Sequence, residues 1–433
     1  MKEPLSRGKT VSEPAREVSV YAEAEVVVVG GGPAGVTAAI AAAREGADTV
    51  LVERYGHLGG MATGGLVLMI NQFPAGQCQE WRARLESAGG ARNIAHTREP
   101  GKVRHSIMVD PELLKCILND MTSAAGVKLL LHSWGTRAIV ERNIIKGIIF
   151  ESKSGRQAVL GEVTIDATGD GDIFASAGAG FDGAMDHGFR SSQMALVFRI
   201  GSIDYDKFVD FRISNTQKWQ EIRDEVDGIA GFHIGPLPGS RGDVVWVNSF
   251  IKGLNPLMVK DLTWVEVNVR KAMLPVYEYF KKRVPGFENS FIYDSASQIG
   301  TRGSRRLIGE YVLTQQDIAS RKTFPDTVAV FPQGVPLGTT PENTPENVGL
   351  PYRCLVPASL DGLLVAGRCF SSDPAANTMF NVIPHCVAMG QAAGTAAALA
   401  VRSKTNPRKV DYQVLRERLS AQGISLPVER STG

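Results

Sequence analysis

Four consecutive valines followed by a glycine-rich turn constrain the fold of this chain more than any other feature. The valines belong to a short, largely apolar run at residues 25–29, and a similar run follows at 49–53. Such runs are typical of strands buried on both faces of a sheet. Between them, residues 34–45 place Ala, Val and Ile at helical spacing and stop at Gly46. We therefore predict a strand, helix, strand unit within a parallel sheet, which indicates an α/β fold.

The turn has the spacing Gly30-x-Gly32-x-x-Gly35. In such a turn the first glycine permits a tight bend, the second lets the backbone approach a pyrophosphate, and the third lets the helix pack closely on the strand. The free N–H groups and the positive end of the helix stabilise the phosphate charge. Glu53 ends the second strand, where a carboxylate bonds ribose hydroxyls. The segment predicts a dinucleotide site.

This fingerprint is shared by NAD and FAD sites, so other segments are needed to choose between them. Three further glycine segments are HLGGMATGG at 57–65, DATGDGD at 166–172 and LLVAGRCFSSD at 363–373. A cofactor that extends across several strand ends needs more close backbone contacts than NAD does in a simple dehydrogenase. These segments favour FAD.

Composition excludes several classes of protein. The 433 residues are 43% hydrophobic and 21% charged, with a formal net charge of +2, which gives little attraction for nucleic acid or an anionic membrane surface. Apolar stretches stay shorter than the roughly 18 residues of a membrane span, and the first 21 residues lack the apolar core of a secretion signal. The five cysteines include no C-x-x-C pair, so we predict no metal site. We expect a cytoplasmic protein.

The pattern along the chain predicts four parts. Residues 1–21 are polar and mixed in charge and are expected to form a mobile leader. Residues 22–183 are predicted to be the first part of an FAD-binding domain with a Rossmann-like parallel sheet. Residues 184–290 are predicted to be an inserted α+β substrate domain with one amphipathic helix. Residues 291–433 are predicted to complete the FAD-binding domain and to contain its C-terminal helix.

Three further elements are predicted within the FAD-binding domain. Asp110 as N-cap and Pro111 in the first turn start a helix that runs to Ala125. β-Rich segments with turns between them follow from 127 to 166 and predict a β-meander. Residues 385–401 form a helix with an unusually small-residue face, which permits close packing on a sheet or a cofactor.

Motifs along most of the chain resemble those of the FAD-dependent oxidoreductase family, which is distantly related to the fumarate reductase and succinate dehydrogenase flavoproteins. Besides the first turn, the resemblance rests on GHLGGMATGG, IDATGDGD, GTRGSRRLIGEYVLTQQDI, FPDTVAV, YRCLVPASLDGLLVAGRCFSSD and GQAAGTAAALA. It implies a glutathione-reductase-like FAD fold, FAD held covalently or non-covalently, and a redox reaction at the isoalloxazine. It implies no particular substrate.

The motifs give a set of predicted cofactor-binding residues: Gly30, Gly32, Pro33, Ala34, Gly35, Glu53, Arg54, Gly60, Met61, Ala62, Thr168, Gly169, Asp172, Gly367, Arg368 and Ala388. Family members often carry an arginine shortly before the proline that precedes the last helix. Here Asn381 stands in that place. A neutral amide does not neutralise a carboxylate as a guanidinium does, which weakens the case for a dicarboxylate substrate.

The predicted catalytic residues are His385, Arg302 and Arg305. The resemblance places His385 near the flavin ring, and imidazole titrates near neutral pH; the alternative is a core or capping histidine. The two arginines suit an anionic or carbonyl group, or else tie the parts of the chain together. His233 lies in a segment suited to a pocket lid or to an exposed loop. His57 leaves covalent attachment of FAD open.

The leading hypothesis for function is a dehydrogenase or reductase that transfers hydride between a small organic substrate and flavin N5. The alternatives are an oxidase or monooxygenase that uses oxygen, and a non-catalytic flavoprotein subunit of a redox complex. The sequence has a single dinucleotide fingerprint, which disfavours a separate NAD(P)H domain. The sequence does not decide whether the electron donor or acceptor is a quinone, oxygen, a nicotinamide or a protein carrier. A homo-oligomer is compatible with the sequence.

Overall fold

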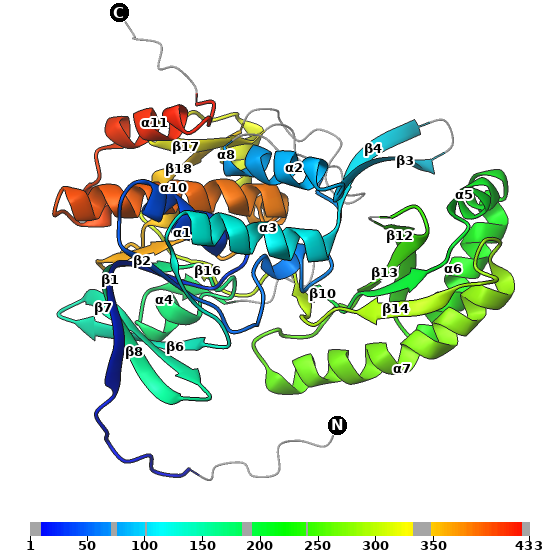
Figure 1. Ribbon diagram of the computed structural model, residues 1–433, viewed down its shortest axis with the longest axis horizontal. Coiled ribbons are helices and arrows are strands. Elements are labelled where there is room, and N and C mark those ends of the chain that lie inside the picture. The colour runs from blue at the N-terminus through cyan, green and yellow to red at the C-terminus, as the bar shows by residue number, and fades with distance from the viewer. Residues whose placement is uncertain are drawn as a thin grey trace, which may run out of the picture.

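The computed structural model describes residues 10–70, 76–99, 102–183, 193–239, 241–331 and 348–426. Figure 1 shows two units side by side, a larger one on the left that contains most of the chain and a smaller one on the right. The larger unit is built around a mixed sheet with a parallel core, and the smaller one around an antiparallel sheet. The predicted fold class, a Rossmann-like sheet with a β-meander and a second α+β unit, is confirmed.

The sheet of the larger unit has the strand order β5-β2-β1-β8-β7-β6, with β19 also paired to β8. β1 lies between β2 and β8 and is parallel to both, whereas β8, β7 and β6 are joined antiparallel as the predicted meander. The strands are β1 (Ser19–Val29), β2 (Thr49–Val52), β5 (Lys128–Leu130), β6 (Trp134–Glu141), β7 (Ile144–Ser152), β8 (Gly155–Asp166) and β19 (Leu363–Val365). Residues 19–21, which fall within the leader predicted for residues 1–21, therefore lie in a strand.

The four valines divide between the two faces of the sheet because side chains alternate along a strand. Val26 and Val28 pack with helices α1 (Pro33–Arg44), α3 (Pro111–Ala124) and α10 (Ile383–Arg402). Val27 and Val29 pack instead with the meander and with α4 (Asp172–Ser176). Both faces are thus covered, as the uninterrupted apolar run predicts.

Helices α1 and α10 approach each other unusually closely. A Cβ atom added to Gly390 would lie 2.0 Å from the carbonyl oxygen of Ala34, and one added to Gly394 would lie 2.1 Å from that of Ala38. Thr37 Oγ1 also donates a hydrogen bond across the contact to the carbonyl oxygen of Val387, at 3.1 Å. The small-residue face predicted for the last long helix is therefore a helix-packing face.

The smaller unit is an antiparallel sheet in the order β12-β13-β11-β14. Its strands are β12 (His233–Pro238), β13 (Val244–Phe250), β11 (Phe198–Gly201) and β14 (Phe291–Ser295), and its helices are α5 (Tyr205–Ser214), α6 (Thr216–Ala230) and α7 (Val259–Arg283). Val245 and Val247 pack with these helices, so the alternate residues Trp246 and Asn248 point to the opposite face. The sheet extends beyond residue 290 through β14, and α5 and α6 add to the single helix expected from the sequence.

The remaining elements connect or cover these two units. They are η1 (Gly60–Ala62), α2 (Gln77–Ser87), β3 (Ala91–Glu99), β4 (Lys102–Val109), β9 (Phe181–Asp182), β10 (Met194–Ala195), β15 (Gly300–Thr301), β16 (Arg306–Leu307), α8 (Gln315–Ala319), β17 (Thr327–Phe331), β18 (Val348–Pro351), η3 (Tyr352–Leu355), α9 (Pro374–Phe380), η4 (Pro407–Lys409) and α11 (Tyr412–Ala421). Over the described ranges, no single helix meets the length and hydropathy of a membrane span; α9 and α10 do so only as a pair bent by 96°.

Candidate functional site

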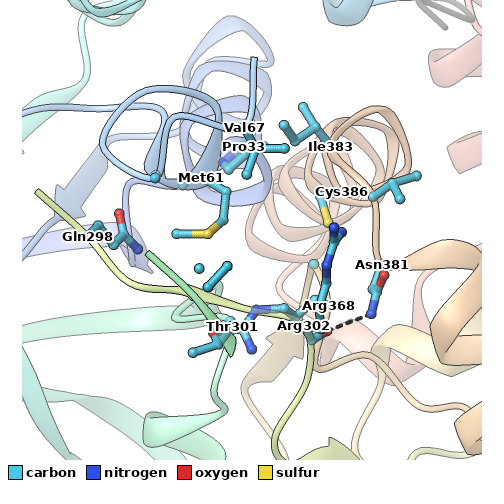
Figure 2. Close-up of a pocket in the computed structure, with 18 of the residues that line it drawn as sticks. Pro33, Met61, Val67, Gln298, Thr301, Arg302, Arg368, Asn381, Ile383 and Cys386 are labelled. Carbon is cyan, nitrogen blue, oxygen red and sulfur yellow. Dashed lines mark hydrogen bonds between the residues drawn. The ribbon is translucent and has the colours of Figure 1, made fainter. Parts of the chain in front are cut away.

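A cavity of about 640 Å³ lies between the carboxyl ends of the central parallel strands and the second sheet. Its first wall comes from the ends of β1, β2, β8 and β19, and its opposite wall comes from β12 and β13. Ligands of open α/β sheets bind at the carboxyl ends of the strands, which is where this cavity begins. Figure 2 shows Met61, Gln298, Thr301, Arg302, Arg368 and Cys386 arranged around its central space.

The glycine turn has the geometry that its spacing predicts. Gly30 has φ +99°, and a Cβ there would lie 2.5 Å from the carbonyl oxygen of Ala167. A Cβ at Gly35 would lie 1.6 Å from the carbonyl oxygen of Gly30, so Gly35 permits helix-to-strand packing. A Cβ at Gly32 would meet no described atom within 4 Å, and Gly32 lines the cavity. Packing within the protein therefore explains Gly30 and Gly35, whereas the space beside Gly32 is open to the cavity.

Glu53 lines the cavity and is held in place by backbone donors. The Gly31 N–H donates to Oε2 at 2.5 Å, and the Tyr55 N–H donates to Oε1 at 2.7 Å. Burial raises the pKa of the Glu53 carboxyl, while the two N–H donors oppose that shift. Each oxygen keeps a further lone pair for a ribose hydroxyl. This geometry fits the role predicted for Glu53.

The turn after β8 is organised by Asp166, which the sequence analysis did not single out. Its Oδ1 accepts hydrogen bonds from the N–H and the hydroxyl of Thr168, at 3.0 and 2.7 Å. Its Oδ2 accepts from the N–H groups of Ile173 and Phe174, at 3.0 and 2.9 Å. Burial raises the pKa of Asp166 to about 6. Asp166 thereby fixes the segment that places Thr168 and Gly169 in the cavity wall.

Most of the predicted cofactor residues meet at this cavity. The lining includes Gly30, Gly32, Pro33, Ala34, Glu53, Arg54, Gly60, Met61, Thr168, Gly169, Asp172, Gly367 and Arg368, together with the predicted catalytic residue Arg302. The described lining does not include Gly35, Ala62, Ala388, Arg305 or His385. Gly35 supports the turn from behind, as explained above.

His385 does not fit the role of catalytic base. Its side chain is only 1% exposed and packs edge to face on Phe380, with 5.2 Å between ring centroids. Its neighbours Pro384 and Cys386 line the cavity, but His385 faces the protein interior. Burial lowers the pKa of His385 to about 3. The alternative interpretation, a core histidine, is the one that this position supports.

Arg305 also has a structural position. Its Nη1 donates to Asp172 Oδ1 at 3.0 Å and to the carbonyl oxygen of Asp170 at 2.9 Å. Asp172 in turn lines the cavity. Arg305 therefore holds the turn after β8 against the segment that follows β15, rather than contacting the cavity itself. Ion pairing explains this arginine better than the catalytic role predicted for it.

Arg302 has the position expected of a residue that contacts a ligand. Its backbone N–H donates to the carbonyl oxygen of Gln193 at 3.0 Å. Asn381 Nδ2 donates to the carbonyl oxygen of Arg302 at 2.6 Å, the contact drawn in Figure 2. Both Arg302 and Asn381 line the cavity. The asparagine at the family's arginine position thus holds the backbone of a nearby arginine.

His57 lies outside the described lining. Its Nε2 is 3.2 Å from Ser297 Oγ, and its ring stacks on Tyr55 with 5.5 Å between centroids. Burial lowers the pKa of His57. These contacts are those of a packed histidine, and nothing in them favours covalent attachment.

The second wall of the cavity contains His233 and, around it, residues that the sequence analysis left out. Trp246, Asn248 and Phe250 alternate along β13, and Leu237 and His233 alternate along β12. Their register pairs Leu237 with Trp246 and His233 with Phe250. The alternation marks one face of a strand, but only the tertiary structure shows that this face turns toward the glycine end.

His233 has the geometry of an acid–base group. Its Nδ1 is 2.7 Å from Asp227 Oδ2, and its ring stacks on Phe250 with 5.4 Å between centroids. Asp227 Oδ1 also accepts from the N–H of Ile234 at 2.9 Å, which fixes the carboxylate. A carboxylate that accepts from Nδ1–H leaves Nε2 as the free acceptor.

Comparison with known families decides the identity of this fold. A family model described as FAD dependent oxidoreductase matches residues 25–419. This chain belongs to that family. The family resemblance predicted from the motifs is confirmed, and so are the cofactor, FAD, and the classification of the chain as an enzyme. Among curated proteins, none matches the chain.

Solved structures of this fold resemble the FAD-dependent oxidoreductase over most of its length. A geranylgeranyl bacteriochlorophyll reductase-like protein from Thermoplasma acidophilum is 15% identical with a TM-score of 0.50, and the match covers 92% of this chain and 82% of that chain. The p-nitrophenol 4-monooxygenase PnpA from Pseudomonas putida DLL-E4 is 12% identical with a TM-score of 0.50, and the match covers 93% and 88%. At these identities the likeness shows the fold alone.

The residues at the glycine end fit FAD. The open space beside Gly32 and the first turn of α1 suit the pyrophosphate, because N–H groups in a first turn lack carbonyl partners in their own helix. Glu53 suits the ribose, and the small residues at Gly60 and Gly367 let the cofactor lie close to the backbone. Cys386 lines the cavity near the start of α10, and burial raises its thiol pKa to about 12, so it is neutral at physiological pH.

Proposed function

We propose that this FAD-dependent oxidoreductase is a dehydrogenase or reductase for a small organic substrate. The observation that carries the proposal is the continuity of one cavity from the glycine turn to the face of the second sheet. One end suits a dinucleotide, and the other end presents apolar and aromatic side chains that a dinucleotide phosphate does not need. Bound FAD supplies the hydride acceptor or donor for this reaction.

The second wall orients the substrate. Val197, Leu237 and Phe250 offer apolar contact, and Arg302 offers a cation between this wall and the glycine end. An apolar wall with a few polar groups is typical of small-molecule sites, in which the apolar area supplies affinity and the polar groups set orientation. Closely packed aromatic side chains also exclude water from the reacting atoms.

His233 transfers the proton that accompanies hydride transfer. When an alcohol or amine is oxidised, the C–H bond gives up hydride and the O–H or N–H group gives up a proton. Nε2 of His233 accepts that proton, and Asp227 stabilises the resulting imidazolium through Nδ1–H. When the substrate is reduced instead, the same proton passes from Nε2 of His233 to the substrate.

The test is anaerobic mixing of the holoenzyme with a panel of alcohols, amines and carboxylic acids, with flavin absorbance as the readout. We expect a member of the panel to bleach the flavin band. Failure of every compound in the panel would favour the non-catalytic subunit. An oxygenated product that forms only in air would favour the monooxygenase alternative.

When the compound that reduces the flavin is used as substrate, the His233→Gln variant is expected to show flavin reduction that is slower by about a hundredfold, because the proton acceptor is lost. FAD content should be unchanged, since His233 lies on the second sheet. The control is His132→Gln, a change outside the described lining. Its flavin should be reduced at the wild-type rate. If the flavin of His233→Gln were reduced as fast as that of the wild type, His233 would have no role in the proton transfer.

A further inference from the structure

We infer that the substrate is a monocarboxylate with an apolar or aromatic body, and that Arg223 and Lys252 bind its carboxylate. The inference rests on the proposed function and names the substrate class of the same cavity. Arg223 is a half-buried residue of α6, and Lys252 is an exposed residue that follows β13. Both line the cavity.

The two cations lie at the same end of the cavity as His233. Lys252 is two residues beyond Phe250, which pairs in register with His233, and two residues of chain span at most about 7 Å. Arg223 lies one helical turn before Asp227, whose carboxylate contacts His233. Arg223 and Lys252 therefore approach the His233–Phe250 pair from two different elements.

No carboxylate among the described residues forms an ion pair with Arg223 or Lys252. Within the described residues, Nη1 of the Arg223 guanidinium donates a hydrogen bond of 3.3 Å to Oε1 of the neutral Gln220 side chain. The acidic residues of α6 are engaged elsewhere: Asp227 by His233, Glu221 by Lys218, Asp224 by Gln220 and Glu225 by Tyr279. The carboxylates of the described lining, Glu53 and Asp172, belong to the glycine end.

Among the described residues that line the second wall, the charged groups are thus two cations beside an apolar surface, and the nearby Asp227 carboxylate is bonded to His233. Arg223 also contributes, after burial, to lowering the pKa of the neighbouring Arg212, which is the effect of a second cation close by. A guanidinium binds a carboxylate with two parallel hydrogen bonds, and an ammonium adds a point charge. Leu237, Trp246 and Phe250 on the same wall would contact the apolar body.

The test uses benzoate and its uncharged analogue benzamide, titrated into the oxidised holoenzyme. Binding is followed by the change in the flavin absorbance spectrum, which needs no turnover. We expect benzoate to bind at least about tenfold more tightly than benzamide, because charged hydrogen bonds are stronger than neutral ones. The affinity for benzoate should fall as salt is added, and the affinity for benzamide should not.

Three variants locate the effect. Arg223→Gln should lower the affinity for benzoate about tenfold. Lys252→Gln should lower it less, since the charge of an exposed cation is better screened by solvent. Both should leave benzamide binding and FAD content unchanged. Lys260→Gln, an exposed cation of α7 that is outside the described lining, should leave both ligands unaffected.

Equal binding of benzoate and benzamide, or no binding of benzoate, would overturn the inference. So would loss of FAD rather than of benzoate in the Arg223 and Lys252 variants, because the cations would then serve the cofactor. The proposed function is judged separately: flavin reduction by a neutral alcohol with no preference for benzoate would uphold the dehydrogenase and reject the carboxylate.

Discussion

Gly32→Val is expected to abolish retention of FAD in a protein that still folds. Gly32 has φ −71° and ψ −174°, which any residue adopts, and a Cβ there would meet no described atom within 4 Å. The valine side chain would instead occupy the space in which the pyrophosphate approaches the backbone. We expect the affinity for FAD to fall about a hundredfold or more, or roughly 2.7 kcal/mol. Fluorescence titration of the apoprotein with FAD measures it.

Gly228→Val is the matched control for this variant. Gly228 also has open space around the added Cβ, but it lies on α6 and outside the described lining. The FAD affinity of Gly228→Val should equal that of the wild type, and circular dichroism should show that both variants are folded. Wild-type affinity in Gly32→Val would disprove the assignment of this turn to the pyrophosphate.

Gly390→Ala is expected to destabilise the fold by about 3 kcal/mol, although alanine normally favours a helix. The added Cβ would lie 2.0 Å from the Ala34 carbonyl oxygen and 2.3 Å from Thr37 Oγ1. Both atoms belong to α1, so α1 and α10 would have to separate, and overpacking of this kind costs about 1–3 kcal/mol, occasionally more. Because α1 begins at the glycine turn, FAD affinity should fall as well. Urea unfolding of the apoprotein measures the stability.

Gly228→Ala controls for helix propensity. This residue lies within α6, and its added Cβ meets no described atom within 4 Å. Alanine there should stabilise the protein by about 0.5–1 kcal/mol, the ordinary gain of replacing glycine in a helix. If Gly390→Ala also stabilised the protein, the close packing of α1 on α10 described above would be contradicted.

The parts of the site that depend on local backbone were predictable from the sequence. Gly30, Gly32 and Gly35 each have a role set by the turn itself, and the strand and helix on either side are read from apolar periodicity. Glu53 follows from its place at the end of the second strand. These residues are close in sequence, so local rules suffice to bring them together.

The parts that depend on long-range packing were not predictable. His385 is in the expected helix, but which face of α10 turns to the cavity depends on its contact with α1, so the adjacent Cys386 lines the cavity instead. His233 and Asp227 are only six residues apart, but their contact depends on how the chain turns at Gly231 from α6 into β12, which the sequence pattern did not predict. The face of β13 with Trp246 shows ordinary alternation, which does not say what it faces.

The central claim is that the cavity at the glycine turn holds FAD, and extraction of the cofactor from the purified native protein tests it most directly. The protein is denatured, and the released compound is identified and quantified by chromatography against FAD and FMN. Our account predicts a yellow protein that releases stoichiometric FAD and no FMN. A folded, colourless protein that releases neither compound and does not bind added FAD would contradict it.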